Sequence, residues 1–356
     1  MKTMRAPISP KKTLWVTGFV ILALAAFFLL RPVFQPKVEC ISLFSYLSGQ
    51  SVEAVTLNLD LQAVYGKDSA DFPAVLSWVE KDGKNISLPV EISVRGKNRR
   101  DVCTFPPLKL SVAETKELGI SKGGSKLVTH CTEGNGETLL MREYLAYRLY
   151  AGLTDASFRT RLIKVTYQDR DGDKDPVDSW AILLESKDDL MKRLDAEEAD
   201  VEGPVKEISA EDYNRFAVFQ FMIGNTDWNL NNQHNVKLLV PRKGGLPFPV
   251  PYDFDRSGLV NAPYADPAQM LPIQTVRERF FQWRGKDRKQ LEPVLELFKQ
   301  RKEDLMGICW DFDALSVQDR QDITQFLEEF FLKMDMLLTE GRTMAHSEEE
   351  IPQRAG

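Results

Sequence analysis

The chain has 356 residues and a formal net charge of −6 at neutral pH. Because the first 31 residues contain basic but no acidic side chains, the rest of the chain is more acidic still. This balance argues against nucleic acid as a general partner, since phosphate backbones are bound by positively charged surfaces. The part behind the basic N-terminal segment is long enough to bury a large core.

Residues 13–30 form an uncharged apolar run. At about 1.5 Å per residue this run spans about 27 Å as a helix, close to the hydrocarbon thickness of a bilayer. Its C-terminal end lacks the small-residue pattern of a cleavage site, so we favour an uncleaved anchor over the alternative, a cleaved signal peptide. More Lys and Arg residues precede the run than follow it, which favours a cytoplasmic tail (1–12) and a main domain in the periplasm or outside the cell.

Behind a juxtamembrane linker (31–44), the first half of the chain is predicted to be rich in strands. Alternating apolar residues and turn residues predict strands over 52–61, 75–79, 88–94, 108–112 and 127–129. Residues 137–153 carry apolar side chains on one broad face and predict a helix. A hairpin over 161–167 and 180–184 completes this β-rich region, to which we assign residues 45–185.

The second region, residues 186–345, is predicted to be mainly helical. Ser209 precedes an apolar stripe, as an N-cap does, and predicts a helix over 209–223. A hairpin with strands over 236–240 and 249–252 interrupts the helices, which resume at residue 275 and continue to 344. The polar tail, residues 346–356, is predicted to be disordered.

Two of the four cysteines, Cys103 and Cys131, lie beside strand-like segments. An oxidising compartment would allow them to pair, and we favour this bridge over the alternative of free buried thiols.

A segment dense in Asn and Asp precedes the predicted hairpin of the second region, and an acidic loop follows it. Asn235 stands just before the first strand and Asp253 just after the second, so antiparallel pairing brings them together, with Asp227 on the neighbouring loop. Hard oxygen ligands of this kind suit Mg²⁺ that holds nucleotide phosphates. Protein kinases use the same arrangement, although Asn232 has the usual kinase spacing from Asp227 and remains the alternative to Asn235.

The segment resembles the CotH family of atypical bacterial kinases, through Asn225-Thr226-Asp227-Trp228 and Asp253-Phe254-Asp255. Weaker likenesses extend it over roughly residues 88–260. They are the Arg95-Gly96 turn with the strand over 105–110, the helix over 141–146 and the strand over 180–185.

The resemblance implies a role for each matched residue. Asp227 would be the catalytic carboxylate. Asn235 and Asp253 would bind the metal, with Asp255 assisting or substituting. Lys109 would contact the nucleotide phosphates and Glu143 would position it, while Lys126 competes with Lys109 for this role. The turn at Arg95 continues as Lys97-Asn98-Arg99-Arg100 without the serines of the family, so its implied contribution is neutralisation of phosphate charge.

The expected fold class is therefore α+β, a protein-kinase-like two-lobed fold preceded by one transmembrane helix. The expected function is Mg²⁺-dependent transfer of phosphate from ATP to a hydroxyl, by default that of a protein substrate. Because ATP is scarce outside the cytoplasm, the alternative is a catalytically inactive binding or assembly protein of the cell envelope.

Overall fold

The computed structural model describes residues 40–339, except 97–98, 201–204, 206, 268–270 and 286. The predicted cytoplasmic tail, the predicted anchor at 13–30 and the polar C-terminal tail lie outside the described residues. Within the described ranges, no helix combines the length and apolar character needed to cross a bilayer. The described residues form one compact unit.

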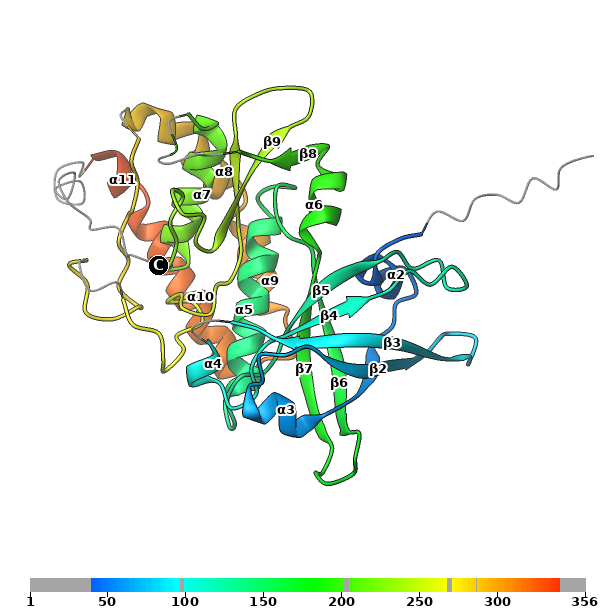
Figure 1. Ribbon diagram of the computed structural model, residues 1–356. Helices are drawn as coiled ribbons and strands as arrows, with labels where there is room; N and C mark the ends of the chain where they lie inside the picture. Colours follow the sequence, from blue (N-terminus) through cyan, green and yellow to red (C-terminus); the bar gives the residue numbers. More distant parts are fainter. Residues whose placement is uncertain are drawn as a thin grey trace, which may run out of the picture. The chain divides into compact units, whose positions relative to one another are not determined.

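Seven strands close into a barrel in the order β1-β2-β3-β4-β5-β7-β6 (Figure 1). Their bounds are β1 Ala54–Leu59, β2 Phe72–Val79, β3 Asn85–Val94, β4 Leu108–Val112, β5 Gly123–Val128, β6 Thr160–Asp169 and β7 Val177–Leu184. Neighbouring strands are antiparallel except β1 and β6, which run parallel and pair Val55 with Val165. This parallel pair closes the barrel.

Alternation along the strands fills the barrel interior with apolar side chains. In β1, Leu57 and Leu59 are fully buried while their neighbours are more exposed. Two short helices, α2 (Leu43–Gly49) and α3 (Leu61–Gly66), add apolar side chains to the same core. A further one-turn helix, α4 (Arg99–Val102), lies between β3 and β4 in the sequence.

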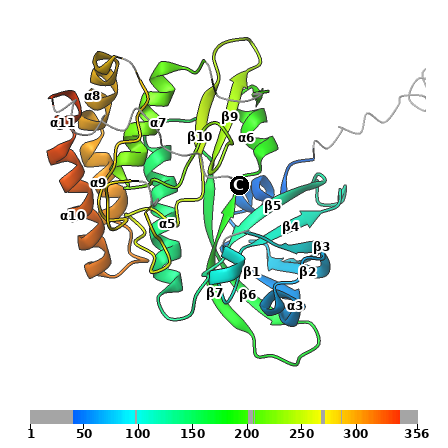
Figure 2. The same ribbon diagram turned by 60° about the vertical axis from the view of Figure 1, so that its left-hand side comes forward.

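The helix α5 (Gly136–Ala151) lies against β6 and β7 on one side and against α9 (Lys302–Trp310) on another (Figure 2). Most of its side chains are buried, because it is covered by the barrel and by other helices. The remaining helices are α6 Lys187–Arg193, α7 Ala210–Met222, η1 Arg288–Leu291, α8 Glu292–Gln300, α10 Val317–Lys333 and α11 Met336–Thr339. With α5 they enclose a second apolar core that is rich in phenylalanine.

A three-stranded antiparallel sheet in the order β10-β9-β8 completes the described structure. Its strands are β8 Ala196–Glu198, β9 Val236–Pro241 and β10 Phe248–Pro251. The predicted hairpin of the second region is therefore present as β9 and β10, and α7 packs beside it.

The expected protein-kinase-like two-lobed fold is wrong. The β-rich half closes on itself through the β1–β6 pair, and the described residues form one compact unit. The local pattern predicts each strand but does not show which strands pair. The partner of β1 is β6, which lies more than a hundred residues away in the chain. The helices also start later than expected: residues 275–285 lie outside helices, and regular structure resumes at Arg288.

Candidate active site at the base of a hairpin

The β9–β10 hairpin brings Asn235 and Asp253 to its open end. Val236 pairs with Pro251, and the Tyr252 amide donates a hydrogen bond to the Asn235 carbonyl at 3.0 Å. Asn235 and Asp253 both have left-handed backbone conformations, with φ of 53° and 65°. Asn and Asp tolerate this region better than most residues, and such strained positions cluster at functional sites.

Both carboxylate oxygens of Asp227 are engaged by neighbouring side chains. Oδ1 lies 3.0 Å from Nε2 of His234, and the Asn235 amide donates to Oδ2 at 3.2 Å. Arg256 adds a longer ion pair, with its Nε 3.9 Å from Oδ2. The side chain of Asp227 is 16% exposed, so the carboxylate is held in one orientation and still reaches solvent.

Buried polar side chains at the end of α7 hold the loop that carries Asp227. The Asn225 side chain accepts the Asp227 amide at 3.0 Å and donates to Gln220 of α7 at 3.0 Å. Gly224 begins this loop with φ of 64°, and a Cβ there would lie 3.1 Å from both a Phe326 ring carbon and the Val276 carbonyl oxygen. A glycine is therefore required where α7 ends, and Asp227 has a rigid support.

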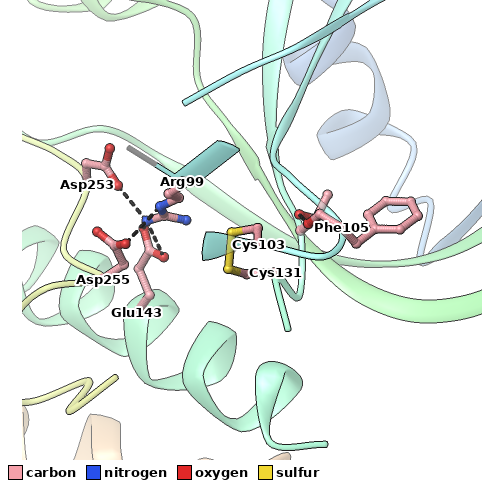
Figure 3. The surroundings of a disulfide bond; sticks show 8 residues. Arg99, Cys103, Phe105, Cys131, Glu143, Asp253 and Asp255 are labelled. Atoms are coloured by element: carbon pink, nitrogen blue, oxygen red, sulfur yellow. Dashed lines mark hydrogen bonds and ion pairs between the residues drawn. A yellow bond between two sulfur atoms is a disulfide. The ribbon is translucent and has the colours of Figure 1, made fainter. Parts of the chain in front are cut away.

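Three carboxylates converge on the guanidinium of Arg99 (Figure 3). Its Nη2 lies 3.0 Å from Oε2 of Glu143 and 2.5 Å from Oδ1 of Asp253, and its Nε lies 2.9 Å from Oδ2 of Asp255. Burial raises the pKa of both Glu143 and Asp255, and repulsion by the neighbouring carboxylates adds to this effect, whereas the charge of Arg99 opposes it. We call these four residues the Arg99 cluster.

A disulfide holds the segment that carries Arg99. Cys103 follows α4 and bonds to Cys131, which precedes α5, so the pairing predicted from the sequence is confirmed. The Cys103 amide donates to the Arg99 carbonyl at 2.8 Å, which links the bridge directly to the helix that carries Arg99.

Lys126 of β5 is the lysine that the structure brings toward Asp253. Its Nζ lies 4.4 Å from the centre of the Tyr252 ring. The pKa of Lys126 is lowered to about 8, chiefly by burial and in addition by the neighbouring charge of Arg95, while the charge of Asp253 opposes both effects. A partly desolvated lysine beside an arginine and an aspartate is a suitable ligand for a nucleotide phosphate.

The other lysine of the sequence prediction, Lys109, lies directly across from Lys126 in the β4–β5 pair. It is exposed, and its side chain extends over Gly124. Among the described residues no contact joins Lys109 to Glu143, which is instead paired with Arg99. The structure therefore favours Lys126 of the two lysines.

The two asparagines that the sequence left open also have different environments. Asn232 is exposed, and its side chain accepts the backbone amide of His234 within the turn. Asn235 is 8% exposed and contacts Asp227. Asn235 is thus the asparagine that belongs to the site.

Of the three predicted magnesium ligands, Asp253 and Asn235 remain candidates. The Asp253 side chain is 40% exposed, and Asp253 directly follows Tyr252, whose amide is bonded to the Asn235 carbonyl, so both residues offer oxygen atoms of the kind that Mg²⁺ prefers. The Asp255 side chain is only 6% exposed and is paired with Arg99, so it does not fit. No group of three or more His, Cys, Asp or Glu side chains within the described ranges is arranged to hold a metal.

Sequence reasoning did not identify Arg99 or His234 as residues of the site. The signal for Arg99 was its position just after the Arg95-Gly96 turn and four residues before Cys103, whose bond to Cys131 brings the turn to α5. The signal for His234 was its place next to Asn235. The position of Arg99 does not identify its carboxylate partners, because Glu143 and Asp253 follow it by 44 and 154 residues, whereas the partner of His234, Asp227, lies in the same loop.

No known family model matches the chain, and no curated protein matches it with significant sequence similarity.

Proposed function

We propose that the protein transfers the terminal phosphoryl group of a nucleotide, ATP, to a hydroxyl group of a protein substrate. The observation that supports this best is the meeting of Asp227, Asn235 and Asp253 at the base of one hairpin, with Lys126 beside it. Phosphoryl transfer requires mainly positioning and charge neutralisation, which such a set of fixed polar groups provides. The resemblance of both acidic loops to CotH-type kinases points to the same chemistry.

In this proposal Asp227 orients the acceptor hydroxyl and accepts its proton. The contacts from His234 and Asn235 hold the carboxylate so that it faces the acceptor in one orientation. The acceptor oxygen forms a bond to the terminal phosphorus while the bond to the leaving nucleoside diphosphate breaks. Lys126 and Arg95 neutralise charge on the nucleotide phosphates.

Asp253 and Asn235 would hold the magnesium ion. When bound, the ion would neutralise charge on the phosphates.

We further propose that residues 13–30 anchor the protein in a membrane and that the described unit lies outside the cytoplasm. The disulfide between Cys103 and Cys131 supports this placement, because disulfides persist mainly in oxidising compartments. Nucleotide would then have to reach the site from outside the cytoplasm.

A second candidate function is a binding or assembly protein of the cell envelope without catalytic activity. The observation that favours it is the pairing of both Asp253 and Asp255 with Arg99, which reduces the carboxylate oxygen left for a metal.

One experiment separates the two functions. The full-length protein, purified in mild detergent, is incubated with γ-labelled ATP and Mg²⁺, and both ATP binding and transfer of label are measured. We expect Asp227→Asn to retain binding and lose transfer, and Lys126→Ala to lose both. Lys109→Ala is the matched control, since it removes the same charge from the facing position and should change neither.

Equal binding and transfer in the parent and in Lys126→Ala would contradict the proposed phosphate site. Binding of ATP without any transfer in the parent protein would favour the second function.

A further inference from the structure

The Arg99 cluster is built into the interior of the protein. The side chains of Arg99, Glu143 and Asp255 are 9%, 3% and 6% exposed. Their charges are therefore shielded from water, and three neighbouring carboxylates would repel one another strongly without a cation between them.

Arg99 meets this requirement by its shape as well as its charge. A guanidinium presents several N–H donors in a planar fork, and here Nη2 forms the hydrogen bonds while Nε forms an ion pair. Nη2 donates to Glu143 and Asp253, while Nε faces Asp255. The carboxylates come from α5 and from the loop after β10, so one arginine joins two separate elements.

The backbone around Arg99 fixes its position. Gly96 has φ of 85°, and a Cβ at this position would lie 3.0 Å from Cβ of Arg99. The turn therefore closes against the base of the arginine side chain, and the Cys103–Cys131 bond holds the other end of α4. Arg99 is thus held in place from both sides.

We propose that Arg99 is the resident cation of the Glu143, Asp253 and Asp255 carboxylates and occupies the position that a second divalent ion would otherwise take. The proposal rests on the proposed function and refines it: the site takes one metal ion, with Asp253 and Asn235 as its protein ligands, and Asp255 is not a ligand of it. Arg99 is a positioning residue, since it acts through the carboxylates that it holds.

The test is binding of Mn²⁺ to the full-length protein in detergent without nucleotide, followed by the electron paramagnetic resonance signal of the free ion. Arg99→Gln should gain about one Mn²⁺ per chain relative to the parent, because three carboxylates then lack a cation. The double variant Arg99→Gln/Glu143→Gln leaves the carboxylates of Asp253 and Asp255 without a cation, so it should also gain an ion, and it is the safer variant for folding because it buries one charge fewer. Arg99→Lys, which keeps the charge, should bind as the parent does.

Asp255→Asn provides a second readout. In the parent background it should change the affinity for Mn²⁺ by less than about twofold, whereas loss of a true ligand would weaken binding by about tenfold or more. In the Arg99→Gln background it should remove the extra ion.

Equal Mn²⁺ binding by the parent and by whichever Arg99→Gln variant folds, as judged by circular dichroism, would overturn the proposal. A tenfold loss in Asp255→Asn would do the same. Failure of the proposed function has a different signature: the parent binds neither ATP nor Mn²⁺, while the arginine variants still gain an ion.

Discussion

Nη2 of Arg99 lies 3.0 Å from Oε2 of Glu143. The glutamate of α5 is therefore paired with an arginine that precedes it by 44 residues in the chain. In the arrangement that the family resemblance implies, Glu143 would instead be paired with a lysine on a strand of the first region. The consequence is that Lys126 is left to interact with a ligand, because its charge is not used to neutralise Glu143. Several expected outcomes depend on these assignments.

Replacement of Glu143 should show how the charges of the cluster are shared. Glu143→Gln should reduce the free energy of unfolding by about 1 kcal/mol or less, because Arg99 keeps two other carboxylates and Gln preserves a hydrogen-bond acceptor. Glu143→Leu should cost more, about 1–3 kcal/mol, because Nη2 then loses a buried acceptor. Urea unfolding measures both values, and equal losses would show that charge rather than hydrogen bonding dominates.

The affinity for ATP should fall as pH rises from 7 to 9. The pKa of Lys126 is lowered to about 8, so its charged form predominates below this pH and is lost above it. A phosphate ligand prefers the charged form, and binding therefore weakens with increasing pH. Lys126→Arg should flatten the profile, since arginine stays charged throughout. A parent profile that is already flat would argue against contact between Lys126 and phosphate.

Two buried tyrosines should respond in opposite directions to loss of the hydroxyl. The Tyr167 hydroxyl inside the barrel has no hydrogen-bond partner among the described residues, so Tyr167→Phe should stabilise the protein by about 1 kcal/mol. The Tyr147 hydroxyl accepts the Asp253 amide at 2.9 Å, so Tyr147→Phe should destabilise it by about 1–3 kcal/mol. Thermal unfolding of the two variants side by side gives the comparison, and a loss of stability in Tyr167→Phe would refute the first assignment.

Arg142 should be a structural residue despite being next to Glu143. Its guanidinium binds Asp319 and Asp322 of α10, each at 2.7 Å, and so connects α5 to α10. Arg142→Ala should lower the free energy of unfolding by about 1–3 kcal/mol without changing affinity for ATP. Arg148→Ala is the matched control, because it removes an arginine from an exposed position of the same helix. A change in ATP affinity without a change in stability would contradict this assignment.

Loss of the disulfide should destabilise the protein by about 3.5 kcal/mol in the chain-entropy model, since it closes a loop over a sequence separation of 28 residues. The double variant Cys103→Ser/Cys131→Ser, compared with the parent in denaturant, measures this loss. A reducing agent should lower the stability of the parent and leave the double variant unchanged, and equal effects on both would point to another thiol.

Local features of the fold were predictable from sequence, and its long-range pairings were not. The strand over 108–112 and the hairpin around residues 236–252 were predicted near their true bounds, because alternation and turn residues mark them directly. The closure of the barrel depends on pairing between β1 and β6, for which no local pattern exists. The prediction of a protein-kinase-like two-lobed fold therefore failed, although the predicted strands were present.

The candidate site shows the same division. The proximity of Asn235 and Asp253 could be predicted from sequence. They stand just before the first strand and just after the second strand of one hairpin, and antiparallel pairing places these two positions side by side. The choice between Lys109 and Lys126 could not be made from sequence, since the two lysines pair across β4 and β5 and the contact of Lys126 with the Tyr252 ring is a long-range one. Arg99 was hidden for a related reason: its three partners come from two segments that are far from it in the chain.

The Cys103–Cys131 bond has one consequence for how the chain responds to proteolysis. It encloses β4 and β5 in a covalent loop, and the turn between these strands carries the exposed residue Lys116. Trypsin that cuts the chain once in this turn would leave both fragments attached to each other, with Lys109 on one and Lys126 on the other. The nick would become visible on a gel only after reduction, and the nicked protein would still carry both lysines.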